Sequence, residues 1–163
     1  MAFAVHNLEE GIGAPLLLQL MQSRGPDFLR GFYSGISAAD MQGSLVILSA
    51  IGICLAAIAA RRSTSRVWSY VMLVFAAVMG LNGLAHAAFS IAWHDYMPGT
   101  LTAVCVTMPV SLALLIRSRR EVWIAPSLRW TLAPAALVVH GPVFAALIPL
   151  FVGVARLLTR RDA

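Results

Sequence analysis

The sequence predicts an all-α protein, a polytopic bundle of transmembrane helices with about five membrane segments. Of its 163 residues, 60% are hydrophobic and only 12% are charged, which is more apolar than an average soluble domain. Several apolar runs approach the roughly 20 residues that cross a bilayer as a helix. We therefore expect residues 1–163 to form a single transmembrane domain, without a linker or an internal repeat.

The charged residues are concentrated at the ends of the apolar runs. All twelve basic residues are arginines, and together with seven acidic residues they give a net charge of +5. The segments "RRSTSR" (61–66) and "RSRR" (117–120) are typical of basic loops beside membrane helices, so we expect membrane lipids and not nucleic acid as partners. The positive-inside rule places both loops in the cytoplasm, and a cell membrane that the chain crosses several times is the expected location.

Three apolar runs predict membrane helices, at 41–60, 67–94 and 98–116. With the arginine loops in the cytoplasm, the short turn "HDYMPGT" (94–100) lies at the opposite face. Proline is tolerated in the first turn of a helix, so we expect Pro98 and Gly99 to open the third helix.

The apolar stretch 122–158 is interrupted by prolines and has two interpretations. The favoured one is a single kinked crossing, which would place Arg156, Arg160 and Arg161 on the non-cytoplasmic side, against the charge rule. The alternative is a break at "HGP" (140–142) that returns the chain inward.

The N-terminal residues also allow two arrangements. Residues 1–22 are long enough to cross completely, but His6 would then lie at the membrane face opposite to the end of the 67–94 helix. We favour a short helix that ends near Glu10 at the non-cytoplasmic face, followed by an interfacial amphipathic segment over 15–35. This arrangement brings the ionisable residues of the two segments together.

The segment "HNLEE" contains three ionisable side chains in apolar surroundings: His6, Glu9 and Glu10. On a helix, positions i+3 and i+4 share a face with position i, so all three are expected to point the same way. A charged side chain at the bilayer centre costs about 2.5 to 3.5 kcal/mol on insertion scales unless it is paired or coordinated. The spacing therefore favours a chelating group.

A second polar group follows one face of the 67–94 helix at steps of four residues: Asn82, His86, Ser90 and His94. Interhelical hydrogen bonding is the favoured role for Ser90, and Tyr96 fits an interfacial aromatic belt. His94 is expected to be solvated at the membrane face. His140 lies near the middle of the last apolar stretch and is divided evenly between packing and ligation.

The two polar motifs together resemble those of the HXXEE-motif family of bacterial multi-pass membrane proteins. The family pattern joins His-x-x-Glu-Glu to Asn-x-x-x-His, a tyrosine ten residues later and Pro-Gly. The matching positions are His6, Glu9, Glu10, Asn82, His86, Tyr96, Pro98 and Gly99. The resemblance covers residues 6 to about 116 and implies a membrane protein of uncharacterised activity. Members have a longer apolar run before the motif, which implies a shortened first crossing here.

Imidazole nitrogens with carboxylate oxygens suit zinc or non-haem iron, and three protein ligands with an open position form a catalytic arrangement. We therefore predict a divalent transition metal (Zn or Fe) held by ligands from a set of four residues: His6, Glu9, Glu10 and His86. One glutamate, Glu9 or Glu10, would be free as a general base for hydrolysis of a hydrophobic or lipid-like substrate. The supporting residues are Asn82, His94, Tyr96 and His140.

A proton-coupled or small-solute transport protein is the alternative function, because buried Glu and His pairs also serve as proton relays. The short chain and the lack of an inverted repeat oppose this alternative, although a homo-oligomer would supply what one chain lacks. A purely structural or partner-binding role is third. Cys54 and Cys105 have no partner spacing and predict neither a disulfide nor a metal pair.

Overall fold

The computed structural model describes residues 1–159, and over these residues the chain is helical without a strand. Four described helices are long and apolar enough to cross a membrane: α4 (Ala38–Arg61), α5 (Arg66–Trp93), Thr100–Arg120 and Pro126–Leu157. The prediction of an all-α bundle is confirmed, and the four candidate membrane spans are close to the predicted number of about five. Arg160 and Arg161, which we expected on the non-cytoplasmic side, lie outside the described residues.

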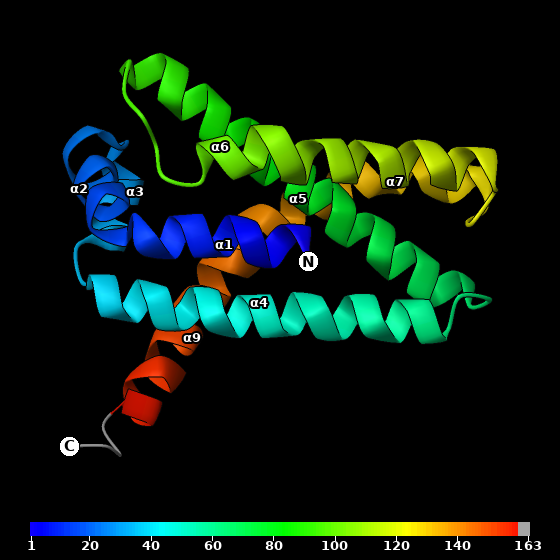
Figure 1. The fold of residues 1–163 in the computed structure, drawn as a ribbon, viewed down its shortest axis with the longest axis horizontal. Helices are drawn as coiled ribbons and strands as arrows, with labels where there is room; N and C mark the ends of the chain where they lie inside the picture. Colours follow the sequence, from blue (N-terminus) through cyan, green and yellow to red (C-terminus); the bar gives the residue numbers. More distant parts are fainter. Residues whose placement is uncertain (160–163) are drawn as a thin grey trace.

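Helices α4 and α5 form an antiparallel pair joined by the first arginine loop. α4 begins with a capping box, in which the Ser37 hydroxyl accepts from the Asp40 N–H and the Asp40 carboxylate accepts from the Ser37 N–H. Figure 1 shows that the α4–α5 turn and the end of α7 (Met108–Arg120) lie at the same end of the bundle. We call this the arginine end and the opposite one the site end.

The third long helix begins two residues later than expected. Pro98 and Gly99 precede its first turn, α6 (Thr100–Thr102), because Gly99 adopts a left-handed conformation with φ 95° that a helix does not continue. A π-helical segment, Ala103–Thr107, then leads into α7. Single π-turns inside helices are frequent at functional sites.

The last long helix continues as one candidate span through a π-helical turn, as the favoured interpretation predicts. It consists of η2 (Pro126–Thr131), α8 (Leu132–Val138), the π-helical η3 (Val139–Val143) and α9 (Phe144–Thr159). The π-helical turn accommodates Pro142, whose ring removes a normal helical hydrogen bond, so the chain continues instead of turning back at 140–142.

This crossing places Arg156 at the site end, where a membrane protein is expected to have few arginines. Its guanidinium donates to both carboxylate oxygens of Asp40, at 2.7 and 2.6 Å, and to the Gly35 carbonyl oxygen at 3.1 Å. The Asp40 carboxylate therefore neutralises the residue that opposes the charge rule, and the ion pair fixes α9 to the start of α4.

The N-terminal arrangement agrees with the favoured interpretation. Helix α1 (Ala2–Ile12) lies beside α4, and α2 (Ala14–Arg24) and α3 (Asp27–Tyr33) cover the site end of the bundle (Figure 1). A Cβ at Gly13, between α1 and α2, would lie 2.4 Å from the Pro98 Cβ. The close approach at this position holds the 94–99 loop against the α1–α2 corner.

We predict that the arginine end faces the cytoplasm. Cysteines introduced at Ser63 and Arg120 in a variant without native cysteines should resist an impermeant reagent added outside intact cells. A cysteine at Ser34, which is exposed at the site end, should react and serves as the matched control. Labelling of the first two positions without labelling at Ser34 would reverse the topology.

Candidate metal centre

Three buried side chains from two helices meet at the site end: His6 and Glu10 of α1 and His86 of α5. One potential ligand atom from each lies within 4.8 Å of the others. The His86 Nε2 atom is 2.7 Å from Glu10 Oε1, and His6 Nε2 is 3.7 Å from Glu10 Oε2. Ligand atoms around a tetrahedral ion with bonds of about 2.0–2.1 Å lie roughly 3.3 Å apart, so modest side-chain adjustment would accommodate an ion. The predicted convergence is confirmed for these three residues.

Hydrogen bonds hold the His6 ring in one tautomer. Its Nδ1 atom lies 3.1 Å from the Gly99 carbonyl oxygen, which only accepts, so Nδ1 carries the proton. Its Nε2 atom accepts from the Asn82 amide at 2.8 Å. Because Nε2 keeps its lone pair, this nitrogen is already in the protonation state that metal ligation needs.

Asn82 connects the cluster to His140, which belongs to the π-helical η3. The Asn82 side-chain oxygen accepts from His140 Nε2 at 3.1 Å while its amide nitrogen donates to His6. The chain His140, Asn82, His6, Gly99 therefore has one consistent direction of donation. The predicted supporting roles of Asn82 and His140 agree with this geometry.

His86 contains a buried polar atom without a hydrogen-bond partner. Its Nε2 donates to Glu10, which leaves Nδ1 as an acceptor that no described group satisfies. An unsatisfied buried acceptor costs about 1–3 kcal/mol. If an ion takes Nε2 as its ligand, the ring proton moves to Nδ1, and Nδ1 then becomes a donor that also has no described partner.

Gly99 forms the wall of the cluster. A Cβ at this position would lie 2.7 Å from Glu10 Cγ, 2.8 Å from His86 Cε1 and 3.0 Å from His6 Cε1. Its φ of 95° is also unfavourable for any other residue. Glycine is therefore required here by both the backbone and the packing, which explains the Pro98–Gly99 part of the motif.

Glu9 has a different position from the one we expected. Its Oε1 accepts from the Gly99 N–H at 3.0 Å and the Leu101 N–H at 3.3 Å, and its Oε2 accepts from the Thr102 N–H at 2.7 Å. These are the unpaired amides of the first turn of α6, where the helix dipole also favours an anion. Glu9 thus caps this helix and lies outside the cluster, so its predicted roles as ligand and base are not supported.

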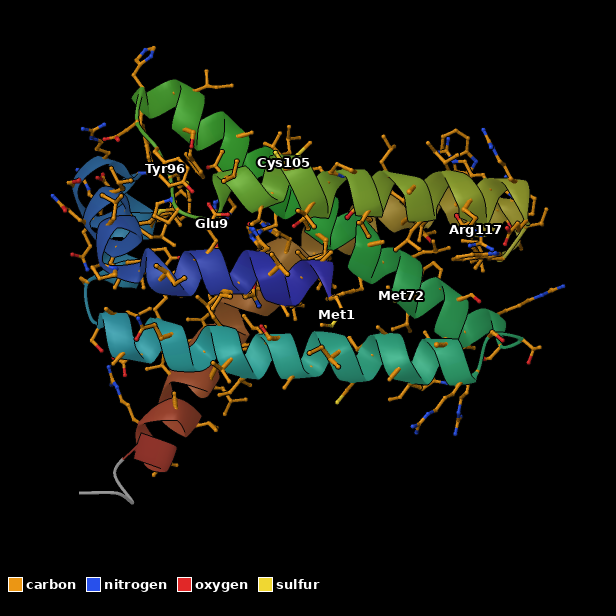
Figure 2. The ribbon with its side chains drawn as sticks, viewed as in Figure 1. Met1, Glu9, Met72, Tyr96, Cys105 and Arg117 are labelled. Carbon is orange, nitrogen blue, oxygen red and sulfur yellow. The ribbon has the colours of Figure 1, made fainter. Side chains whose placement is uncertain are left out.

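Two further predicted residues are also outside the cluster. The Tyr96 hydroxyl donates to Glu9 Oε1, and burial together with the Glu9 charge raises the pKa of Tyr96 to about 12. Figure 2 shows both side chains between α1 and the start of α6. His94 ends α5 in a left-handed conformation and is exposed, so it supports no site. Ser90 accepts from the Met97 N–H at 3.1 Å and bonds Thr100, as the structural interpretation predicts.

The cluster borders an apolar cavity of about 530 Å³. Glu10, His86, Asn82 and His140 line one part of its wall, and side chains from α2, α3, α4, α5 and α9 line the rest. Tyr33 of α3 is among them, and burial and the Glu10 charge raise its pKa to about 12. The Thr102 hydroxyl lies 3.2 Å from His6 Nδ1. Neither Tyr33 nor Thr102 could be predicted as a site residue, because neither belongs to a periodic polar pattern in the sequence.

A family model described as a protein of unknown function with an HXXEE motif matches residues 1–114. The chain belongs to this HXXEE family. No curated protein and no solved structure matches it. In this HXXEE protein the motif has two separate roles, since His6 and Glu10 join the cluster while Glu9 caps α6.

We predict that Glu9→Ala lowers the stability of the HXXEE protein by about 1–2 kcal/mol, because three amides of α6 lose their cap. Thermal unfolding in detergent, followed by circular dichroism, measures the change. Glu121→Ala, which removes an exposed carboxylate at the opposite end of the same long helix, should leave the melting temperature unchanged. Equal melting of Glu9→Ala and wild type would contradict the capping role.

Proposed function

We propose that this protein is a metal-dependent membrane enzyme that acts on a hydrophobic, lipid-like substrate, with hydrolysis as its reaction. The observation that carries the proposal is that the buried His6–Glu10–His86 cluster borders an apolar cavity large enough for a small molecule. Buried polar groups beside an otherwise apolar cavity are typical of sites that bind and orient a ligand.

The donor set suits zinc or iron. Two imidazoles and one carboxylate leave a coordination position open on a four-coordinate ion, and Glu10 and His86 face the cavity. Binding would replace the Asn82–His6 and Glu10–His86 hydrogen bonds with metal–ligand bonds. The His6 Nδ1 bond to Gly99 would remain and would orient the ring, as is usual for histidine ligands.

Hydrolysis adds a water oxygen to the acyl carbon of the substrate and breaks the bond from that carbon to the leaving oxygen or nitrogen. A bound divalent ion polarises the carbonyl and makes a proton of water labile. With Glu9 committed to α6, His140 is the side chain placed to accept this proton and return it to the leaving group. It lines the cavity, and its Nε2 donates to the Asn82 side-chain oxygen.

The proposed location is a bacterial cytoplasmic membrane, with the site in the non-cytoplasmic half. Four helices long and apolar enough to cross, and basic loops gathered at the opposite end, support this orientation. The expected partners are membrane lipids, and assembly into a homo-oligomer is compatible with the exposed apolar faces of the long helices.

Proton-coupled or solute transport is the second candidate. The buried contact between Glu10 and His86 favours it, because chains of Asp, Glu and His side chains form proton relays in membrane proteins. The two candidates differ in one requirement, since the relay needs no metal.

We expect wild-type protein purified gently in detergent to hold close to one equivalent of zinc or iron by elemental analysis. His86→Ala and Glu10→Gln should each lose most of this metal, by tenfold or more, because each removes one of three ligands. His94→Asn is the matched control, since it replaces an exposed histidine of the same helix with a residue that tolerates its left-handed conformation. Circular dichroism should show unchanged helicity in all variants.

Wild-type protein that is metal-free and takes up neither zinc nor iron would contradict the enzyme. Transport would then be tested in proteoliposomes, where a pH-dependent flux abolished by Glu10→Gln would support the second candidate.

A further inference from the structure

Among the described residues that line the cavity, none is an arginine or a lysine. The described residues that line it are mostly Phe, Leu, Met, Ile and Val, and its single charged group is the Glu10 carboxylate. Polar atoms come from a few neutral or titratable side chains: Asn7, Tyr33, Ser44, Asn82, His86 and His140. Phosphate or sulfate head groups are normally bound by arginine, lysine or a set of backbone amides. The described wall contains no arginine and no lysine.

The arginines nearest to this end of the bundle are engaged elsewhere. Among the described residues, three ion pairs involve these arginines: Arg24 with Asp95 at 3.3 Å, Arg30 with Asp27, and Arg156 with Asp40 at 2.6 Å. None of these arginines lines the cavity. A head group inside it therefore has no arginine as counter-charge.

We propose that the cavity binds an uncharged lipid with a single chain, whose ester, amide or hydroxyl group lies at the His6–Glu10–His86 cluster. The claim that this lipid is a substrate rests on the proposed function. The claim that the cavity binds it rests on the cavity alone. It excludes lipids with a phosphate monoester head group as substrates.

With a metal present, electrostatics still disfavours a phosphate monoester as the head group. A divalent ion and the Glu10 carboxylate together have one net positive charge. A phosphate monoester has about −1.5 to −2 charges near neutral pH, so its burial would leave uncompensated negative charge in apolar surroundings. An ester or amide carbonyl has no such penalty, and Asn82, Tyr33 and His140 supply neutral hydrogen-bonding groups for it.

The volume favours one chain. A water molecule occupies roughly 30 Å³, so a cavity of about 530 Å³ holds on the order of eighteen groups of that size, which is close to one long acyl chain with a small head. A second chain of this length would lie outside this volume. The apolar lining extends from Phe3 of α1 to Phe32 of α3, which gives the chain a continuous hydrophobic surface.

Photoaffinity labelling tests the proposal in the full-length protein in detergent. The probe is a long-chain alcohol with a diazirine on its chain, and the competitors are monoacylglycerol and lysophosphatidate with the same acyl chain. Ala145→Trp fills the cavity from its wall, and Ala146→Trp adds the same bulk at an exposed neighbour that does not line it.

Labelling should be saturable, and monoacylglycerol should compete at least tenfold better than lysophosphatidate. It should fall about tenfold in Ala145→Trp and persist in Ala146→Trp. Equal competition by the two lipids, or full labelling of Ala145→Trp, would overturn the proposal. Absence of metal from the wild type would defeat the enzyme without changing these results, so the two failures are distinguishable.

Discussion

A carboxylate in an apolar helical bundle needs partners for its charge. The adjacent carboxylates of Glu9 and Glu10 therefore need two separate sets of partners. An unpaired buried charge costs several kcal/mol, which is comparable to the stability of a whole domain. Glu9 is satisfied by the first amides of α6, and Glu10 by His86 and His6. The position of α1 between α4, α5 and the third long helix follows from these contacts.

The contacts of Glu9 and those of Glu10 depend on each other through the 94–99 loop. Glu9 holds the Gly99 amide, and the Gly99 carbonyl holds His6 Nδ1, so the cap of α6 also orients a proposed ligand. Gly99 additionally provides the space in which Glu10, His86 and His6 meet. A change at Glu9 is therefore expected to disturb the cluster without belonging to it. Positioning of a ligand by a neighbouring group is the usual arrangement around metal sites.

Much of this organisation could be predicted from periodicity. Apolar runs gave the four long helices, and steps of four residues placed His6 with Glu10 and Asn82 with His86 on common faces. The direction of Glu9 could not be predicted in the same way, because i+3 and i+4 positions both neighbour His6 and only the tertiary partners distinguish them. Pro98 and Gly99 fit a first helical turn locally, but the left-handed Gly99 is imposed by the packing of the cluster.

The cavity and the role of His140 depend on contacts between distant helices, which a single sequence does not contain. The π-helical turn at Val139–Val143 absorbs Pro142 and brings His140 to Asn82. A single crossing places Arg156 on the non-cytoplasmic side, against the charge rule. Its ion pair with Asp40, 116 positions away in the sequence, neutralises this charge.

The central claim is that His6, Glu10 and His86 together form a metal site. X-ray absorption at the zinc edge of zinc-loaded protein measures the ligands directly. The account predicts nitrogen and oxygen ligands at about 2.0–2.2 Å, with imidazole scattering that corresponds to two histidines and falls to one in His6→Ala. A sulfur shell near 2.3 Å, or an oxygen shell without imidazole scattering, would contradict it.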